Sequence, residues 1–189
     1  MDYEVGASCF GCHAGLSGRG VLGRVYRNLK HNEVRCTLKR QKGTICEAQY
    51  DWGSSRYCGP TSLSAITGHG TAMICGWVRR RTGAQYVKGM NTSVAVQYLK
   101  EHGYEVELAW QQTKWGLGWP AGSEGTAITL RRFVEFHARP RDVYLINVTG
   151  HFLVLHKNKI VCTSTGGRIA DADSSTYLRC RVKKAWRVS

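Results

Sequence analysis

Apolar residues recur at helical spacing in four segments of the chain, and a glycine or a proline follows each of them. These two residue types interrupt helices, because proline lacks a backbone N–H and glycine readily adopts the left-handed conformation that ends a helix. The pattern therefore predicts four helices. They begin near Pro60, Ala72, Asn91 and Ile128, and they end at or before Gly68, Gly83, Gly103 and Pro140.

Alternating or continuous runs of apolar residues predict extended strands elsewhere in the chain. The predicted strands cover residues 33–38, 44–50, 104–110, 143–148, 152–155, 159–161 and 178–188. We expect the first two to form a hairpin, and 152–155 and 159–161 to form another around Lys157 and Asn158. From residue 57 onward most helices precede the strands, so the order predicts an α+β fold, with a helical half followed by an antiparallel sheet.

The chain divides into two regions of different composition. Glycines interrupt the first 50 residues, which also hold four of the eight cysteines, whereas the pattern becomes regular from Tyr57 onward. We therefore predict a glycine- and cysteine-rich N-terminal segment over residues 1–50 and one domain over residues 51–189.

The N-terminal cysteines have a spacing that suits a metal site. Cys9 and Cys12 form a Cys-x-x-Cys pair, and the predicted hairpin could bring Cys36 and Cys46 together. Four thiolates in this arrangement can bind a structural zinc ion, which would stabilise a segment that has few large apolar residues. The alternative is that these thiols bind no metal.

The chain is strongly basic. Twenty-seven lysines and arginines stand against thirteen acidic residues, which gives a net charge of +14. This balance favours nucleic acid or an acidic protein as a partner, although a basic surface can also serve solubility alone. No apolar run is long enough to span a membrane. The acidic first residues lack the order of a secretory signal, so we expect a cytoplasmic protein, or one assembled into a particle there, with reduced cysteines.

Cys58 is the candidate nucleophile. It stands where the first predicted helix begins, and the unpaired N–H groups and partial positive charge of a helix N-terminus favour a thiolate. Gly59 would allow a substrate carbonyl to approach closely, and the backbone N–H of Cys58 would stabilise the oxyanion that forms there. A cysteine by itself is more often a small buried apolar residue.

His151 is the candidate base. It follows Gly150 and begins a predicted strand in the sheet half, whereas Cys58 lies in the helical half. Cysteine hydrolases built from two halves place their nucleophile and base in this way. The alternative is an ordinary histidine at the end of a strand. The two local contexts together favour a Cys–His pair.

The motifs around these residues resemble those of a known family. The runs at 57–63 (YCGPTSL) and 65–68 (AITG) are similar to the nucleophile helix of the C39-like branch of the papain-like cysteine peptidases, in particular to small bacteriophage proteins. The runs at 129–133 (TLRRF) and 150–155 (GHFLVL), and the basic end with Trp186, also match. The resemblance covers residues 57–188 and implies a papain-like fold.

The chain departs from this family at two positions. The resemblance implies an aspartate after the histidine hairpin, which would orient the imidazole, but Cys162 stands there. A thiol is a weak acceptor and supplies no charge. The residues that could replace the aspartate are Thr163, Asn147 and Asp173. The family also places an oxyanion-hole glutamine before the nucleophile, where this chain has Trp52, so Gln49, three residues earlier, is the candidate.

Two hypotheses follow. In the first, the chain is a phage-type papain-like hydrolase that cleaves a peptide or isopeptide bond in the bacterial host cytoplasm and needs no cofactor for catalysis. Cys58 would attack the carbonyl carbon, and His151 would take up and return the proton. In the second, the fold has lost its activity, and a basic virion or host-takeover protein binds nucleic acid or an acidic protein.

Overall fold

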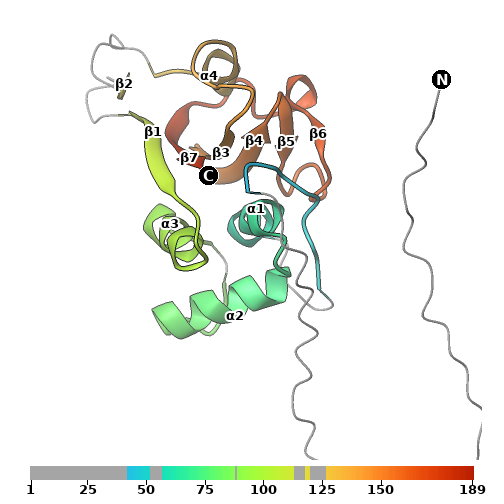
Figure 1. The fold of residues 1–189 in the computed structure, drawn as a ribbon, viewed down its shortest axis with the longest axis vertical. Coiled ribbons are helices and arrows are strands. Elements are labelled where there is room, and N and C mark those ends of the chain that lie inside the picture. Colours follow the sequence, from blue (N-terminus) through green and yellow to red (C-terminus); the bar gives the residue numbers. More distant parts are fainter. Residues whose placement is uncertain (1–41, 52–56, 88, 113–117, 120–126) are drawn as a thin grey trace, which may run out of the picture. The chain divides into compact units, whose positions relative to one another are not determined.

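The computed structural model describes residues 42–51, 57–87, 89–112, 118–119 and 127–189 (Figure 1). The α+β class predicted from the sequence is confirmed for these residues. Three helices come first, and a fourth lies between the second and third strands. The helices are α1 (Cys58–Thr67), α2 (Thr71–Thr82), α3 (Thr92–Glu101) and α4 (Leu130–Phe136).

The described strands form one antiparallel sheet in the order β2-β1-β7-β3-β4-β5-β6. The strands are β1 (Val106–Gln112), β2 (Gly118–Trp119), β3 (Val143–Val148), β4 (His151–His156), β5 (Lys159–Val161), β6 (Ala170–Asp171) and β7 (Val182–Val188). The last strand of the chain, β7, therefore lies inside the sheet between β1 and β3. Its central place ties the C-terminus to the core.

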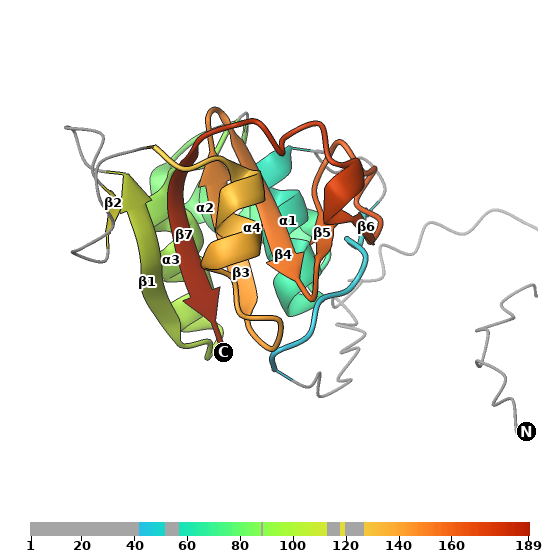
Figure 2. The ribbon, with the colours of Figure 1, turned by 90° about the horizontal axis from the view of Figure 1, so that it is seen from above.

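The sheet is covered on both faces, by α1, α2 and α3 on one side and by α4 on the other (Figure 2). Side chains alternate along β3, so Val143 and Leu145 pack with the first three helices while Tyr144 and Ile146 pack with α4. A strand that is buried on both faces has no polar side. This explains why residues 143–148 read as a continuous apolar run.

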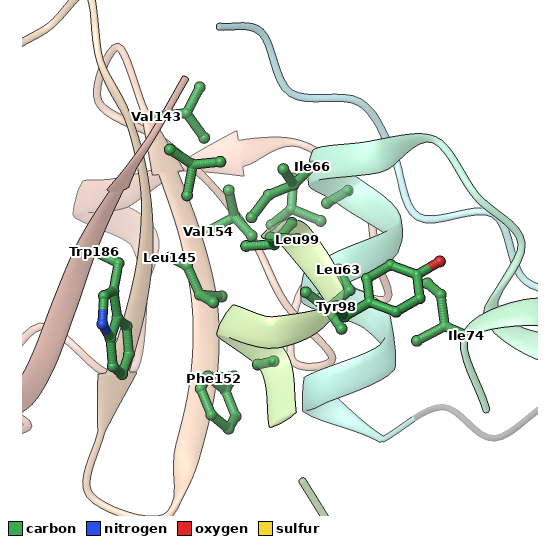
Figure 3. Close-up of a cluster of buried hydrophobic side chains, with 14 residues drawn as sticks. Leu63, Ile66, Ile74, Tyr98, Leu99, Val143, Leu145, Phe152, Val154 and Trp186 are labelled. Atoms are coloured by element: carbon green, nitrogen blue, oxygen red, sulfur yellow. The ribbon is translucent and has the colours of Figure 1, made fainter. Parts of the chain in front are cut away.

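One cluster of buried apolar side chains joins α1 and α3 to the sheet (Figure 3). Leu63 and Ile66 of α1 and Leu99 of α3 meet Phe152 and Val154 of β4 in this cluster. All five are almost fully buried, and burying side chains of this size stabilises the fold by about 1.5–3 kcal/mol each. The cluster holds the N-terminal half of the domain against the strand that carries His151.

The predicted helix ends agree closely with the structure. Gly68 and Gly83 follow α1 and α2 with φ of 73° and 70°, and each donates its backbone N–H to the preceding turn. The hairpin of β4 and β5 turns at Lys157 and Asn158, whose φ values of 48° and 57° suit a tight two-residue turn. Local sequence signals therefore decided these boundaries.

Two predicted strands differ from the structure. The last strand begins at Val182 rather than at residue 178, because the carbonyl oxygens of Leu178 and Cys180 accept from the first N–H groups of α4. Residues 44–50 were predicted as a strand, and this is wrong. Their backbone N–H groups bond outside any sheet, as in Cys46 to Ala65 O and Ala48 to Gly167 O. The partner strand of that predicted hairpin, 33–38, lies outside the described residues.

Candidate active site

Cys58 is the first residue of α1 and is half-buried. Tyr57, in an extended conformation, precedes it and accepts the first backbone bond of the helix, from Thr61 N–H at 3.0 Å. The N–H groups of Cys58 and Gly59 have no acceptor within the helix, since the first turn of any helix leaves its donors unpaired. The thiol therefore stands at the positive end of a ten-residue helix, where a thiolate or an oxyanion is stabilised.

The start of α1 is held rigidly by its surroundings. Every residue from Gly59 to Thr67 is buried, and α1 packs against α2, α3 and β4. A Cβ atom added at Gly59 would lie 2.8 Å from Cβ of Met90. The prediction that Gly59 leaves space for a substrate carbonyl is therefore corrected, because Met90 occupies the space next to it. The missing side chain makes room for Met90 and so fixes the direction of the helix end.

His151 begins β4 and is only 7% exposed. The turn before it includes Gly150 with φ of 73°, and Val148 of β3 pairs with His151 directly across the turn. The Nε2 atom is buried and has no hydrogen-bond partner among the described residues. Burial lowers the pKa of the imidazole below its ordinary value of 6.5, so the ring is neutral at neutral pH and able to accept a proton.

Tyr177 covers one face of the imidazole, and the sequence analysis did not single it out. Its ring stacks on that of His151 with centroids 4.2 Å apart and planes 7° from parallel. Burial raises the pKa of the Tyr177 hydroxyl, and the charges of nearby thiolates raise it further. These thiols belong to Cys162, Cys58 and Cys180. Tyr177 therefore stacks on the candidate base and lies within electrostatic reach of the candidate nucleophile.

The structure thus gathers Cys58 and His151 around Tyr177, from the helical layer and from the sheet. Among the described residues, no hydrogen bond joins the thiol to the imidazole. Catalytic hydrogen bonds are often longer without substrate than in the reacting complex. The chemistry available to this arrangement is attack by a thiolate with proton transfer to a neutral imidazole.

Cys162 follows β5 and is fully buried beside Ile160 and Leu153. Its sulfur lies 2.9 Å from the hydroxyl oxygen of Ser164, and its backbone N–H donates to Thr165 Oγ1 at 3.2 Å. The thiol therefore has a hydrogen-bond partner other than the imidazole. This is consistent with the Nε2 atom of His151 being left without a partner.

The other residues considered for orienting the imidazole bond elsewhere. Asn147 donates its side-chain N–H to the backbone carbonyl oxygen of His151, at 3.3 Å, and so holds the strand rather than the ring. The carboxylate of Asp173 accepts from Asn158 at 3.3 Å. Thr163 accepts a turn hydrogen bond with its backbone carbonyl oxygen. None of these contacts reaches a ring nitrogen of His151.

Gln49 lies in the extended segment that packs along α1. Its backbone N–H donates to Ser64 Oγ at 2.8 Å, and its exposed side-chain amide donates to Glu47 O at 3.1 Å. Ser64 is six residues beyond Cys58, which corresponds to about 9 Å along a helix. The backbone of Gln49 is therefore attached well beyond the first turn of α1, and its amide group is engaged locally.

Of the four cysteines predicted to bind zinc, Cys9, Cys12 and Cys36 lie outside the described residues. Cys46 is half-buried, and its thiol donates to the carbonyl oxygens of Ser64 and Ala65 at 3.7 and 3.5 Å. Within the described part of the chain, no group of three or more His, Cys, Asp or Glu residues has the arrangement of a metal site. The zinc site stays a prediction.

A cavity of about 300 Å³ lies near His156, at the end of β4 opposite His151. Its walls include His156, Leu155 and Arg139, but neither Cys58 nor His151. His151 and His156 are five residues apart on one strand, a separation of about 17 Å. The thiol and the unpartnered imidazole, rather than this cavity, therefore identify the candidate active site.

Comparisons with known proteins assign no family to the chain. No family model, no curated protein and no solved structure matches it. The described part of the chain contains no helix that is long and apolar enough to cross a membrane. The functional argument therefore rests on the geometry of the site and on the sequence motifs.

Proposed function

We propose that the chain is a papain-like thiol hydrolase that cleaves a peptide or isopeptide bond. The observation that carries the proposal is the buried, unpartnered Nε2 atom of His151. A buried polar atom without a partner costs about 1–3 kcal/mol, and a catalytic role is one reason for a fold to keep such an atom. Ser62, Trp110 and Gln112 also hold an unpartnered buried atom, but of the four only the imidazole of His151 can take up a proton at neutral pH. A thiol at a helix N-terminus lies near enough to the hydroxyl of Tyr177 to raise its pKa, and this thiol would supply the nucleophile of the reaction.

In the proposed reaction, the imidazole of His151 takes the proton of the Cys58 thiol, and the sulfur attacks the carbonyl carbon of the amide. The oxyanion accepts hydrogen bonds from the free N–H groups at the start of α1. The C–N bond then breaks, and the amine leaves with the proton from His151. Water, deprotonated by the same ring, hydrolyses the thioester and regenerates the thiol.

Tyr177 takes over part of the role that an aspartate would have at the position of Cys162. Stacking fixes the plane of the imidazole, and the negative face of the phenol ring attracts the imidazolium that forms during the reaction. This contribution is smaller than that of a carboxylate, because a ring quadrupole carries no net charge. We therefore expect a slow hydrolase.

A second candidate function is supported by Cys162 itself. Its thiol is bonded to Ser164, and no charged group accepts from the ring of His151 among the described residues. A chain that no longer turns over substrate would keep the fold and act as a basic virion or host-takeover protein. Its net charge of +14 would then bind nucleic acid or an acidic protein.

The reactivity of Cys58 tests the first function. Iodoacetamide is applied at about pH 6, where ordinary thiols with a pKa near 8.5 react slowly, and each cysteine is quantified by peptide mass spectrometry. We expect Cys58 to react tens of times faster than Cys180, a half-buried thiol at the same site that serves as the internal control. Equal, slow labelling of both would contradict the proposal.

Turnover is tested with a tryptic peptide mixture from a bacterial lysate. New peptide termini that appear with the wild-type protein, and not with Cys58→Ala, would identify the cleaved bonds. If Cys58 is unreactive and both proteins retain equal, salt-sensitive affinity for DNA or for an acidic protein, the second function replaces the first.

A further inference from the structure

A pocket of about 360 Å³ is lined by residues between Ser164 and Thr176, in the segment that follows Cys162 and precedes Tyr177. Five of its lining residues carry hydroxyl groups, and Arg168 is the one charged residue among the residues that line it. The lining residues are Ser164, Thr165, Arg168, Ile169, Ala170, Ser174, Ser175 and Thr176. The pocket is therefore polar, and its only formal charge is positive.

Two residues of the pocket wall touch the active site directly. Ser164 Oγ lies 2.9 Å from the sulfur of Cys162, and Ser175 Oγ accepts the backbone N–H of Tyr177 at 3.1 Å. The ring of Tyr177 in turn stacks on His151. These contacts link the pocket wall to Cys162 and to the residue that stacks on the candidate base.

Some of the pocket's hydrogen-bond donors are free to bind a ligand. Ser175 Oγ already accepts an N–H, so its own proton is available to a ligand. The hydroxyl of Thr176 and the guanidinium of Arg168 have no partner among the described residues. By contrast, Thr165 and Ser174 use their protons on backbone carbonyl oxygens. Free hydroxyl donors beside an unpaired arginine suit a carboxylate.

No carboxylate of the protein neutralises Arg168 in the described structure. Asp171, near it in sequence, forms an ion pair with Lys159. The net charge of +14 would also raise the local concentration of anionic substrates around the molecule.

We infer that this pocket binds the carboxylate of an acidic residue in the substrate, and that the enzyme therefore prefers acidic peptides. The inference rests on the proposed function, because it names the substrate class of the same site. Arg168 is the residue that determines the specificity, with Ser175 and Thr176 as supporting donors.

The test uses peptidyl acyloxymethyl ketones, which alkylate a reactive thiol after binding as a substrate would. Three matched pairs carry glutamate or glutamine at the first, second or third residue from the reactive group. We expect the glutamate probe of one pair to label Cys58 about three to five times faster than its glutamine counterpart, the range for an exposed ion pair with added hydrogen bonds.

Arg168→Gln should bring this ratio close to one, whereas Arg81→Gln, on the exposed last turn of α2, should leave it unchanged. The two variants lose the same charge, so the comparison separates the pocket from general electrostatic attraction. Ratios near one in the wild-type protein, or equal effects of the two substitutions, would overturn the inference.

A binding experiment separates this inference from the proposed function. The α-amides of N-acetylglutamate and N-acetylglutamine are titrated into the Cys58→Ala variant, and the backbone amide resonances of residues 164–176 are followed by NMR. We expect shifts with the glutamate compound alone, and their loss in Cys58→Ala/Arg168→Gln. If Cys58 proves unreactive in the labelling experiment but the shifts appear, the hydrolase is refuted and the carboxylate pocket is retained. No shifts beside a reactive Cys58 would refute the pocket alone.

Discussion

The two ends of β4 carry two histidines that are equally buried but differ in the hydrogen bonds of their ring nitrogens. His151 and His156 are both 7% exposed. Nδ1 of His156 donates to the carbonyl oxygen of Asp142 at 3.2 Å. At the other end, Nε2 of His151 has no partner among the described residues, and its ring is stacked on Tyr177. The comparison shows that burial alone does not distinguish a structural histidine from a candidate catalytic one.

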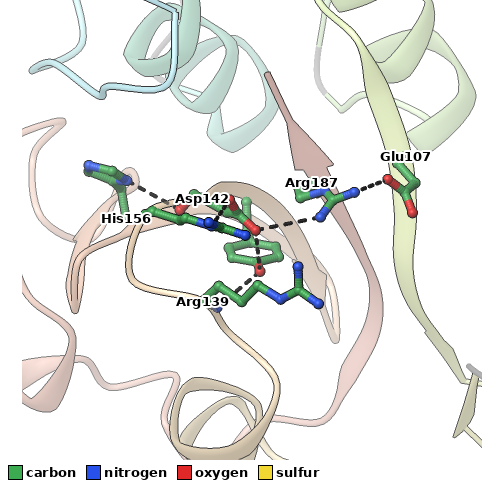
Figure 4. A network of polar contacts seen from close by, with 7 residues as sticks. Glu107, Arg139, Asp142, His156 and Arg187 are labelled. Carbon is green, nitrogen blue, oxygen red and sulfur yellow. Dashed lines mark hydrogen bonds and ion pairs between the residues drawn. The ribbon is translucent and has the colours of Figure 1, made fainter.

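The surroundings of His156 explain why its end of the strand is structural (Figure 4). The carboxylate of Asp142 accepts from the hydroxyl of Tyr144 at 3.4 Å and lies 3.7 Å from the guanidinium of Arg187, which also pairs with Glu107. The polar groups named here therefore have partners that belong to the fold. At the His151 end the Nε2 atom has no such partner among the described residues, and in the proposed reaction the Cys58 thiol would fill that place.

Exchanging the two histidines for alanine should give opposite results. We expect His151→Ala to lower the rate of Cys58 alkylation at about pH 6 by tens of times, to about the rate of Cys180, because the thiol loses the base that takes up its proton. His156→Ala should leave that rate unchanged and destabilise the protein by about 1–3 kcal/mol, because the Asp142 carbonyl loses its donor. Alkylation rates and urea unfolding measure the two effects. Equal effects of the two substitutions on alkylation would contradict the assignment of His151 as the base and of His156 as a structural residue.

The stacked ring at the His151 end should contribute less than the imidazole itself. Tyr177→Leu keeps the site buried but removes the aromatic face, so we expect Cys58 to react about fivefold more slowly near pH 6. Tyr177→Phe retains the face and should restore the wild-type rate. Tyr86, which is 74% exposed, provides the matched control in Tyr86→Leu. If Tyr177→Phe is as slow as Tyr177→Leu, the hydroxyl rather than the stacked ring is responsible.

The buried imidazole of His151 should also make the fold sensitive to acid. Burial lowers its folded-state pKa below 6.5, so the unfolded state binds the proton more readily. Protonation of His151 therefore does not affect the free energy of unfolding above about pH 6.5. Below that pH it lowers the free energy of unfolding, by at most about 1.4 kcal/mol per pH unit. His69 and His137, whose pKa values are also lowered by burial, act in the same direction. Urea unfolding at several pH values should show a shallower loss for His151→Asn than for the wild type.

The smallest effect is expected in the network at the His156 end. Glu107 and Arg187 form an exposed ion pair, and exposed pairs contribute about 0–1 kcal/mol. Glu107→Gln should therefore change the free energy of unfolding by less than about 1 kcal/mol, with the difference disappearing in concentrated salt. A larger, salt-independent loss would show that the network, rather than the single bond from His156 to the Asp142 carbonyl, stabilises this end.

Local signals in the sequence predicted much of the fold. The glycines at positions 68 and 83 end helices through their own backbone conformation, and the turn at Lys157 and Asn158 is equally local. The strand predicted over residues 44–50 failed for the opposite reason. Alternation predicts an extended backbone, but the partner of that backbone is α1 and a distant loop, and no local pattern specifies such a partner.

The sequence by itself determined that a thiol begins a helix and that a histidine begins a strand, because caps, glycines and apolar periodicity act over a few residues. Only the tertiary structure decided what surrounds these two groups. It filled the space at Gly59 with Met90, and it stacked Tyr177 on His151. It also bonded the Cys162 thiol to Ser164. Contacts between residues far apart in the chain depend on how the layers pack, and no neighbouring residue encodes them.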